Sequence, residues 1–168
     1  MTRTKKLTEI AIAVAMAAIC SFIKVWEMPM GGSISLTMVP ILLISFRQGW
    51  KTGMIAGAVY GVVSIVSAGV IYHPMSILLD YVLAFGLLGL SGAFSKSTKG
   101  IIFGSFFGVG GRFLSSLVSG AVLFAEYAPE GQNPWIYSFV YQATYLIPEL
   151  VISVVILIFL FKKVKQIF

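Results

Sequence analysis

Charged residues are scarce in this sequence. Only 11% of its 168 residues are Asp, Glu, Lys or Arg, whereas 58% are hydrophobic, and the mean hydropathy is +0.97. A soluble domain of this length needs far more polar surface to face water. The composition therefore predicts an integral membrane protein.

Residues that carry catalytic or metal chemistry are also few. The chain contains one cysteine, Cys20, and one histidine, His73. A single cysteine forms no intramolecular disulfide, and this set supports neither a metal site nor a Ser-His-Asp or Cys-His arrangement. The ATP-binding pattern GxxxxGK[ST] is missing too. We therefore expect no enzymatic activity, no metal and no cofactor.

Long apolar runs fill most of the chain. They predict one membrane domain over residues 1–168, an all-α bundle of six transmembrane helices. A membrane helix needs about 20 residues. The second run is shorter, so it spans only if Ser33–Leu36 extends it, or if it is tilted or partly unwound. The expected spans are 7–25, 34–46, 52–72, 74–94, 101–125 and 135–161.

Basic residues separate these runs in four clusters, which predicts the orientation of the helices. With six spans, the N-terminus, two alternate loops and the C-terminus lie on one side and carry 10 of the 12 Lys and Arg residues. Such an excess marks the cytoplasmic side, so both termini are predicted to be cytoplasmic. The clusters are Arg3, Lys5 and Lys6; Arg47 and Lys51; Lys96 and Lys99; and Lys162, Lys163 and Lys165.

Small residues recur at helical spacing, which in lipid allows two backbones to approach closely. Rows of glycine at 53, 57 and 61 and at 100, 104 and 108 predict packing between helices. A stripe in the first helix, Ala11, Ala15 and Ala18, has two interpretations: internal packing, or a docking surface for another membrane protein.

One carboxylate, Asp80, stands within the apolar run of the fourth span. It lies six residues after Pro74, roughly 9 Å along a helix that starts on the outer side. A charge at this depth is costly unless a partner or ligand compensates it. Either a neighbouring helix satisfies Asp80, or it faces a ligand in an outer pocket with the adjacent Tyr81.

Two further charges lie deep in the fifth and sixth spans. Arg112 and Glu149 both fall near mid-depth of helices that run antiparallel. An ion pair between them explains both charges at the lowest cost, and a proton relay is the alternative.

Aromatic residues concentrate in the outer half of the predicted bundle. Phe124 and Tyr137 occupy helix positions on the same side as Asp80. Aromatic faces beside one carboxylate suit a flat cationic ring, since cation–π attraction and a counter-charge act together.

Several segments give the chain a resemblance to a known family. In order along the sequence it resembles the thiamine-specific S components of energy-coupling factor (ECF) transporters. The similar segments are LTEIAIAVAMAA, MGGSISLTMVPILLISFRQGWKTG, SILLDYVLAF, RFLSSLVSGAVLFAEYAPEG and PWIYSFVYQATYLIPE.

The resemblance implies the S-component fold and a place in a bacterial cell membrane as a multi-pass protein. It implies high-affinity binding of a vitamin from outside, as one subunit of an ABC importer. The implied partners are a transmembrane coupling protein and two cytoplasmic ATPases, but no nucleic acid. The AxxxA motif that docks on the coupling protein corresponds to Ala11 and Ala15.

The family pattern also implies a substrate-binding set. Ser116 and Gln142 stand where the family usually has a histidine and an asparagine, so the exact ring that is bound stays open. Besides thiamine, we consider its hydroxymethylpyrimidine half or a vitamin B6 form. A solitary proton-coupled carrier and a structural subunit without a ligand are alternatives from other classes. The implied substrate-binding residues are Asp80, Tyr81, Ser116, Gly120, Phe124, Tyr137 and Gln142.

Overall fold

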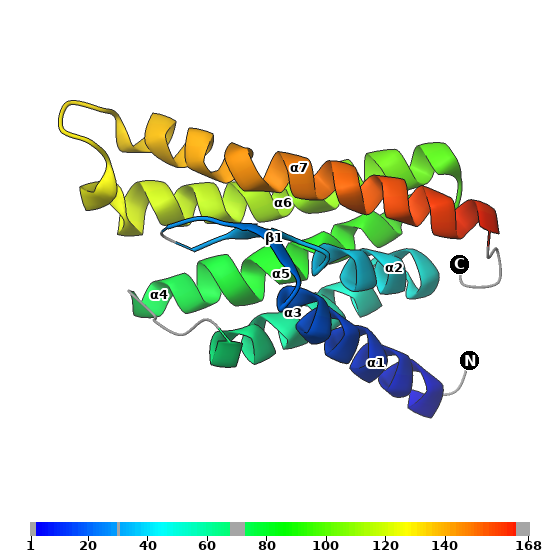
Figure 1. Cartoon of the computed structure of the whole chain (residues 1–168). Helices are drawn as coiled ribbons and strands as arrows, with labels where there is room; N and C mark the ends of the chain where they lie inside the picture. The colour runs from blue at the N-terminus through cyan, green and yellow to red at the C-terminus, as the bar shows by residue number, and fades with distance from the viewer. Residues whose placement is uncertain (1–2, 30, 68–72, 164–168) are drawn as a thin grey trace.

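The protein folds as a helical bundle with one short β-hairpin (Figure 1). The computed structural model describes residues 3–29, 31–67 and 73–163. Within these residues six helical segments follow one another, and the fourth, residues 74–93, changes its winding along its length. The six segments are α1 (Arg3–Ser21), α2 (Met38–Gln48), α3 (Trp50–Ser67), the fourth helix (α4, Pro74–Ser76; η1, Ile77–Leu83; α5, Ala84–Leu87; η2, Leu88–Ala93), α6 (Thr98–Leu123) and α7 (Pro134–Lys163).

The prediction of six helices is confirmed. Three of the described helices are long and apolar enough to cross a membrane: the fourth helix, α6 and α7. α2 and α3 are apolar but shorter, so the crossing of all six remains a prediction. The predicted end of the third span, residue 72, lies outside the described residues.

A hairpin that was not predicted lies between α1 and α2. β1 (Lys24–Glu27) and β2 (Ser33–Ser35) pair antiparallel, with Trp26 opposite Ile34. The predicted first span therefore ends too late, and Ser33–Ser35 do not extend the second helix. Gly31 and Gly32 make the reversal possible, because their φ angles of 92° and 87° are strained for other residues.

The hydrophobic core surrounds α2. Its side chains Met38, Ile41 and Leu42 are fully buried, although the helix has only 11 residues. Leu88 of the fourth helix and Leu157 of α7 complete this cluster from two sides. α2 is thus enclosed by the other helices. Because α2 is short, the hairpin that precedes it occupies the space next to its N-terminal end.

The glycine rows bring backbones together, as predicted. A Cβ atom at Gly57 of α3 would overlap the carbonyl oxygen of Phe85 in the fourth helix. A Cβ at Gly108 of α6 would come within 2.7 Å of the carbonyl oxygen of Leu88. Both rows therefore hold the fourth helix between α3 and α6.

The beginning of α1 and the end of α7 lie at the same end of the bundle (Figure 1). The turn between α6 and α7 lies at the opposite end, with the first turns of the fourth helix. A short helical turn, η3 (Ala125–Tyr127), begins this connection. The end of the bundle that carries the α6–α7 turn is therefore the end away from the beginning of α1 and the end of α7 (Figure 1).

Candidate ligand-binding site

A cavity of about 790 Å³ occupies the bundle between the hairpin and the helices. Its volume falls within the range of small-molecule sites in proteins. The walls come from the last turns of α1, α3 and α6 and the first turns of the fourth helix and α7. The hairpin and the start of α2 complete them. The cavity thus belongs to the end of the bundle away from the start of α1.

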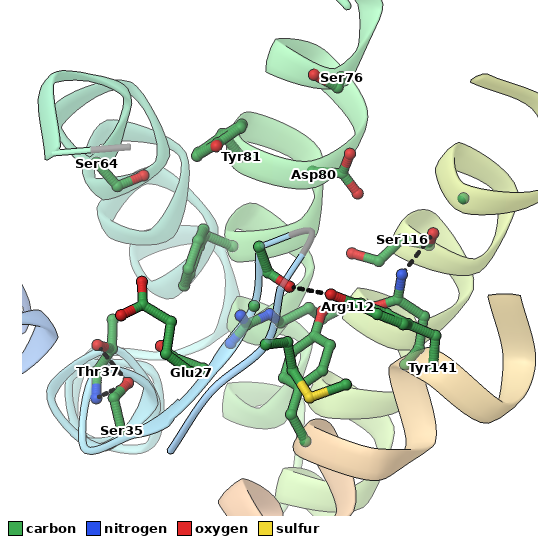
Figure 2. Close-up of a pocket in the computed structure, with 18 of the residues that line it drawn as sticks. Glu27, Ser35, Thr37, Ser64, Ser76, Asp80, Tyr81, Arg112, Ser116 and Tyr141 are labelled. Carbon is green, nitrogen blue, oxygen red and sulfur yellow. Dashed lines mark hydrogen bonds between the residues drawn. The ribbon is translucent and has the colours of Figure 1, made fainter. Parts of the chain in front are cut away.

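Asp80 projects into this cavity from the wide turn η1 (Figure 2). Its Oδ2 atom accepts a hydrogen bond from Ser119 of α6 at 2.5 Å. Among the described residues no Lys, Arg or His forms an ion pair with it. The neighbouring helix α6 therefore supplies a neutral hydroxyl donor to the carboxylate, while no cationic side chain among the described residues forms an ion pair with it.

Tyr81, the next residue, points to the other side of the fourth helix, toward α3 (Figure 2). Both side chains still line the same cavity. One step along the chain therefore places a carboxylate on the α6 side and a phenol on the α3 side.

A buried ion pair forms the deep part of the wall. Arg112 Nη1 lies 3.4 Å from Glu149 Oε2, so the predicted pair between α6 and α7 is confirmed. The guanidinium also lies 4.3 Å from the centre of the Phe85 ring, and Glu149 Oε1 accepts a hydrogen bond from Ser35 of the hairpin at 3.0 Å. These contacts join α6, α7, the fourth helix and the hairpin at one point.

α7 fixes the opposite wall through hydrogen bonds to α6. Gln142 Nε2 donates to the backbone carbonyl of Ser116 at 3.2 Å, and Gln142 Oε1 accepts from the hydroxyl of Tyr145. Ser138 donates to the carbonyl of Leu117 at 2.9 Å and lies against Gly120, where any larger residue would overlap it. The Gln142 amide is thus oriented before a ligand enters. These bonds use one of the two hydrogens on Nε2, so the other N–H can donate to a ligand.

The structure brings together every residue implied for substrate binding. All seven side chains or backbones line this one cavity, although they come from three separate helices and the turn after α6. Their contact with a ligand is still a prediction. Ala11 and Ala15 lie elsewhere, exposed on the surface of α1.

The sequence reading missed the contribution of the hairpin. Residues 27–29 and 31–33 line the cavity, and the Tyr141 hydroxyl donates to the carbonyl of Gly31 at 2.9 Å. The Tyr145 ring lies so close to Gly32 that a Cβ there would come within 2.8 Å of it. The signal was present as Pro29, Gly31 and Gly32, a turn between two short strands.

A helical membrane bundle with a ligand-sized cavity at one end, and a carboxylate in its wall, is a membrane protein that binds a small molecule. Comparison with known proteins identifies the family. The model of the family described as Thiamine transporter protein (Thia_YuaJ) matches residues 7–168. The chain belongs to this family, whose members are transporters and not enzymes.

Individual relatives agree over nearly the whole chain. It is 40% identical to the thiamine transporter ThiT of Bacillus subtilis, covering 93% of this chain and 90% of that protein. Identity to ThiT of Lacticaseibacillus paracasei is 25%, over 96% and 89% of the two chains. The solved structure of ThiT from Listeria monocytogenes superposes with a TM-score of 0.87 at 27% identity, covering 98% and 97%.

Proposed function

We propose that this chain is the thiamine-binding S component of an ECF importer. One observation carries the proposal: Asp80 presents a carboxylate, without an ion-pair partner in the part of the chain that the structure describes, to a cavity of about 790 Å³. A charge at this depth is tolerable when the empty cavity is wet and the bound ligand is a cation. Thiamine carries a permanent positive charge on its thiazolium ring, so one carboxylate neutralises it without proton transfer.

The remaining residues of the cavity wall would supply the other contacts to the two rings of thiamine. Phe124 offers an aromatic face, and Gly120 allows a ring to approach the backbone of α6. Tyr81, Tyr137 and the free N–H of Gln142 supply hydrogen bonds, while Ser116 lines the wall beside them.

The site gives little support to Glu149 as the proton site of a proton-coupled carrier. Glu149 is 1% exposed and engaged by both Arg112 and Ser35, which leaves it in a structural role. A carrier that works by protonation needs a carboxylate that can change partners.

Equilibrium binding to the purified protein tests the substrate. We expect thiamine to bind at least about 30-fold more tightly than hydroxymethylpyrimidine or pyridoxine, because only thiamine combines the pyrimidine with a fixed cation for Asp80. Titration calorimetry with all three compounds measures this ratio. Tighter binding of pyridoxine or of the pyrimidine half would assign the site to that ring instead.

The energy for uptake is proposed to come from partners, since the sequence has no ATP-binding pattern. A transmembrane coupling protein would dock on the exposed Ala11–Ala15 stripe of α1 and carry two cytoplasmic ATPases. The assembly would lie in the bacterial cell membrane.

We propose further that all six helices cross the membrane, with both termini in the cytoplasm. The excess of basic residues at one set of loops supports this orientation. In a Cys20→Ser background, Gln132→Cys in the α6–α7 turn should react with a membrane-impermeant maleimide on intact cells. Lys99→Cys, at the start of α6, should react only after permeabilisation. The reverse labelling pattern would show that both termini lie outside the cell.

A further inference from the structure

Two serines of α6 lie directly behind the carboxylate of the site. Ser119 donates to Asp80 Oδ2 at 2.5 Å, and Ser115, one turn earlier, donates to the backbone carbonyl of Leu79 at 2.6 Å. Ser119 is fully buried and Ser115 is 7% exposed. Among the described residues that form the cavity wall, neither serine appears, so neither contacts the ligand space.

These bonds fall on an unusual stretch of backbone. Ile77–Leu83 winds as a π-helix, whose wider turn disturbs the regular hydrogen-bond ladder of an α-helix. Ser115 supplies a donor to Leu79 within this turn. The next residue along the chain is Asp80, so the bond fixes the backbone that carries the carboxylate.

The opposite side of the same turn rests on α3. A Cβ atom at Gly61 would overlap the carbonyl of Tyr81 and come within 2.8 Å of Val82 Cα. The π-helical turn is therefore held between α3, which packs against it through the backbone of Gly61, and α6, which donates two hydroxyl hydrogen bonds to it. Such π-turns occur often at functional sites.

We propose that Ser119 and Ser115 are positioning residues that aim the Asp80 carboxylate at a cationic ligand. Ser119 holds the side chain, and Ser115 holds its backbone. Both donors are neutral, so they orient the carboxylate without cancelling the charge that attracts the ligand. A group held in one geometry before binding loses less freedom when the ligand arrives. The proposal rests on the function proposed above and extends it to residues outside the cavity.

A double-mutant cycle on thiamine affinity tests this role. A hydrogen bond to a charged group contributes enough that Ser119→Ala should lower the affinity about 10-fold or more. Ser119→Thr retains the hydroxyl group, so its affinity for thiamine should be close to that of the parent. In an Asp80→Asn background, Ser119→Ala should change the affinity by less than about 2-fold, because Ser119 acts through the charge of Asp80.

Ser105→Ala is the matched control. Ser105 is also fully buried on α6, but its hydroxyl has no hydrogen-bond partner among the described residues. We expect no loss of affinity from this substitution. Ser115→Ala should lower the affinity less than Ser119→Ala, because it acts on the carboxylate only through the backbone.

The outcomes separate this inference from the proposed function. Parent-like affinity of Ser119→Ala, or an equal loss with and without Asp80, would overturn the positioning role. If Asp80→Asn itself bound thiamine as tightly as the parent, both the counter-charge and its positioning would be wrong. A thermal melt of each purified variant shows whether a loss of affinity reflects unfolding.

Discussion

Asp80→Asn should weaken thiamine binding by roughly 30-fold to several-thousand-fold. Removing one member of a buried charge pair typically costs about 2–5 kcal/mol, which corresponds to that range of affinity. Asn preserves the shape and can still accept the hydrogen bond from Ser119, so the loss reports the charge. Hydroxymethylpyrimidine, which is neutral, should lose much less affinity. Titration of both compounds against parent and variant measures the difference.

Glu27→Gln is the matched control for the charge. Glu27 also lines the cavity, but it is exposed on the hairpin and already paired with Lys24. We expect an affinity change of less than about 3-fold, because exposed ion pairs contribute little. The fold of Asp80→Asn should survive, since the change removes a charge from a membrane segment. If it bound thiamine like the parent, Asp80 would be a structural carboxylate.

Ala15→Trp should abolish thiamine uptake while leaving binding intact. Small residues act through close approach of two backbones, and an indole at this position would hold a partner helix away. Ala15 is exposed on α1 and is no part of the cavity wall formed by the described residues, so the purified variant should bind thiamine like the parent. Uptake of labelled thiamine and co-purification with the coupling protein measure the loss.

Val155→Trp provides the comparison for bulk alone. Val155 is 61% exposed on α7, so a Trp there meets lipid, and uptake should be unaffected. Unchanged uptake by Ala15→Trp would place the docking surface elsewhere. Loss of uptake in both variants would show that bulk on any outer face is harmful.

Much of the fold could be predicted because it depends on local composition. Six apolar runs separated by basic clusters predicted six helices, and the pairing of Arg112 with Glu149 followed from their equal depth on antiparallel helices. The glycine rows predicted close packing because a missing side chain has the same consequence in any bundle. Each of these inferences needs only the order and spacing of residues.

The hairpin was the main failure of sequence reading. Residues 22–35 contain enough apolar side chains to look like the ends of two helices, and only the turn at Gly31 and Gly32 argues against it. What stabilises the hairpin lies far away in sequence: Tyr141 bonds Gly31, and Glu149 bonds Ser35. Periodicity within a segment cannot report partners more than one hundred residues distant.

By itself, the sequence determined that the chain is a helical membrane protein with a carboxylate in an apolar segment, because a charge in lipid is conspicuous wherever it occurs. Only the tertiary structure decided how that carboxylate is used. It widened the helix at Ile77–Leu83 and placed Ser115 and Ser119 behind Asp80. It also left the charge without a cationic partner among the described residues, because the orientation of a side chain depends on the helices packed around it.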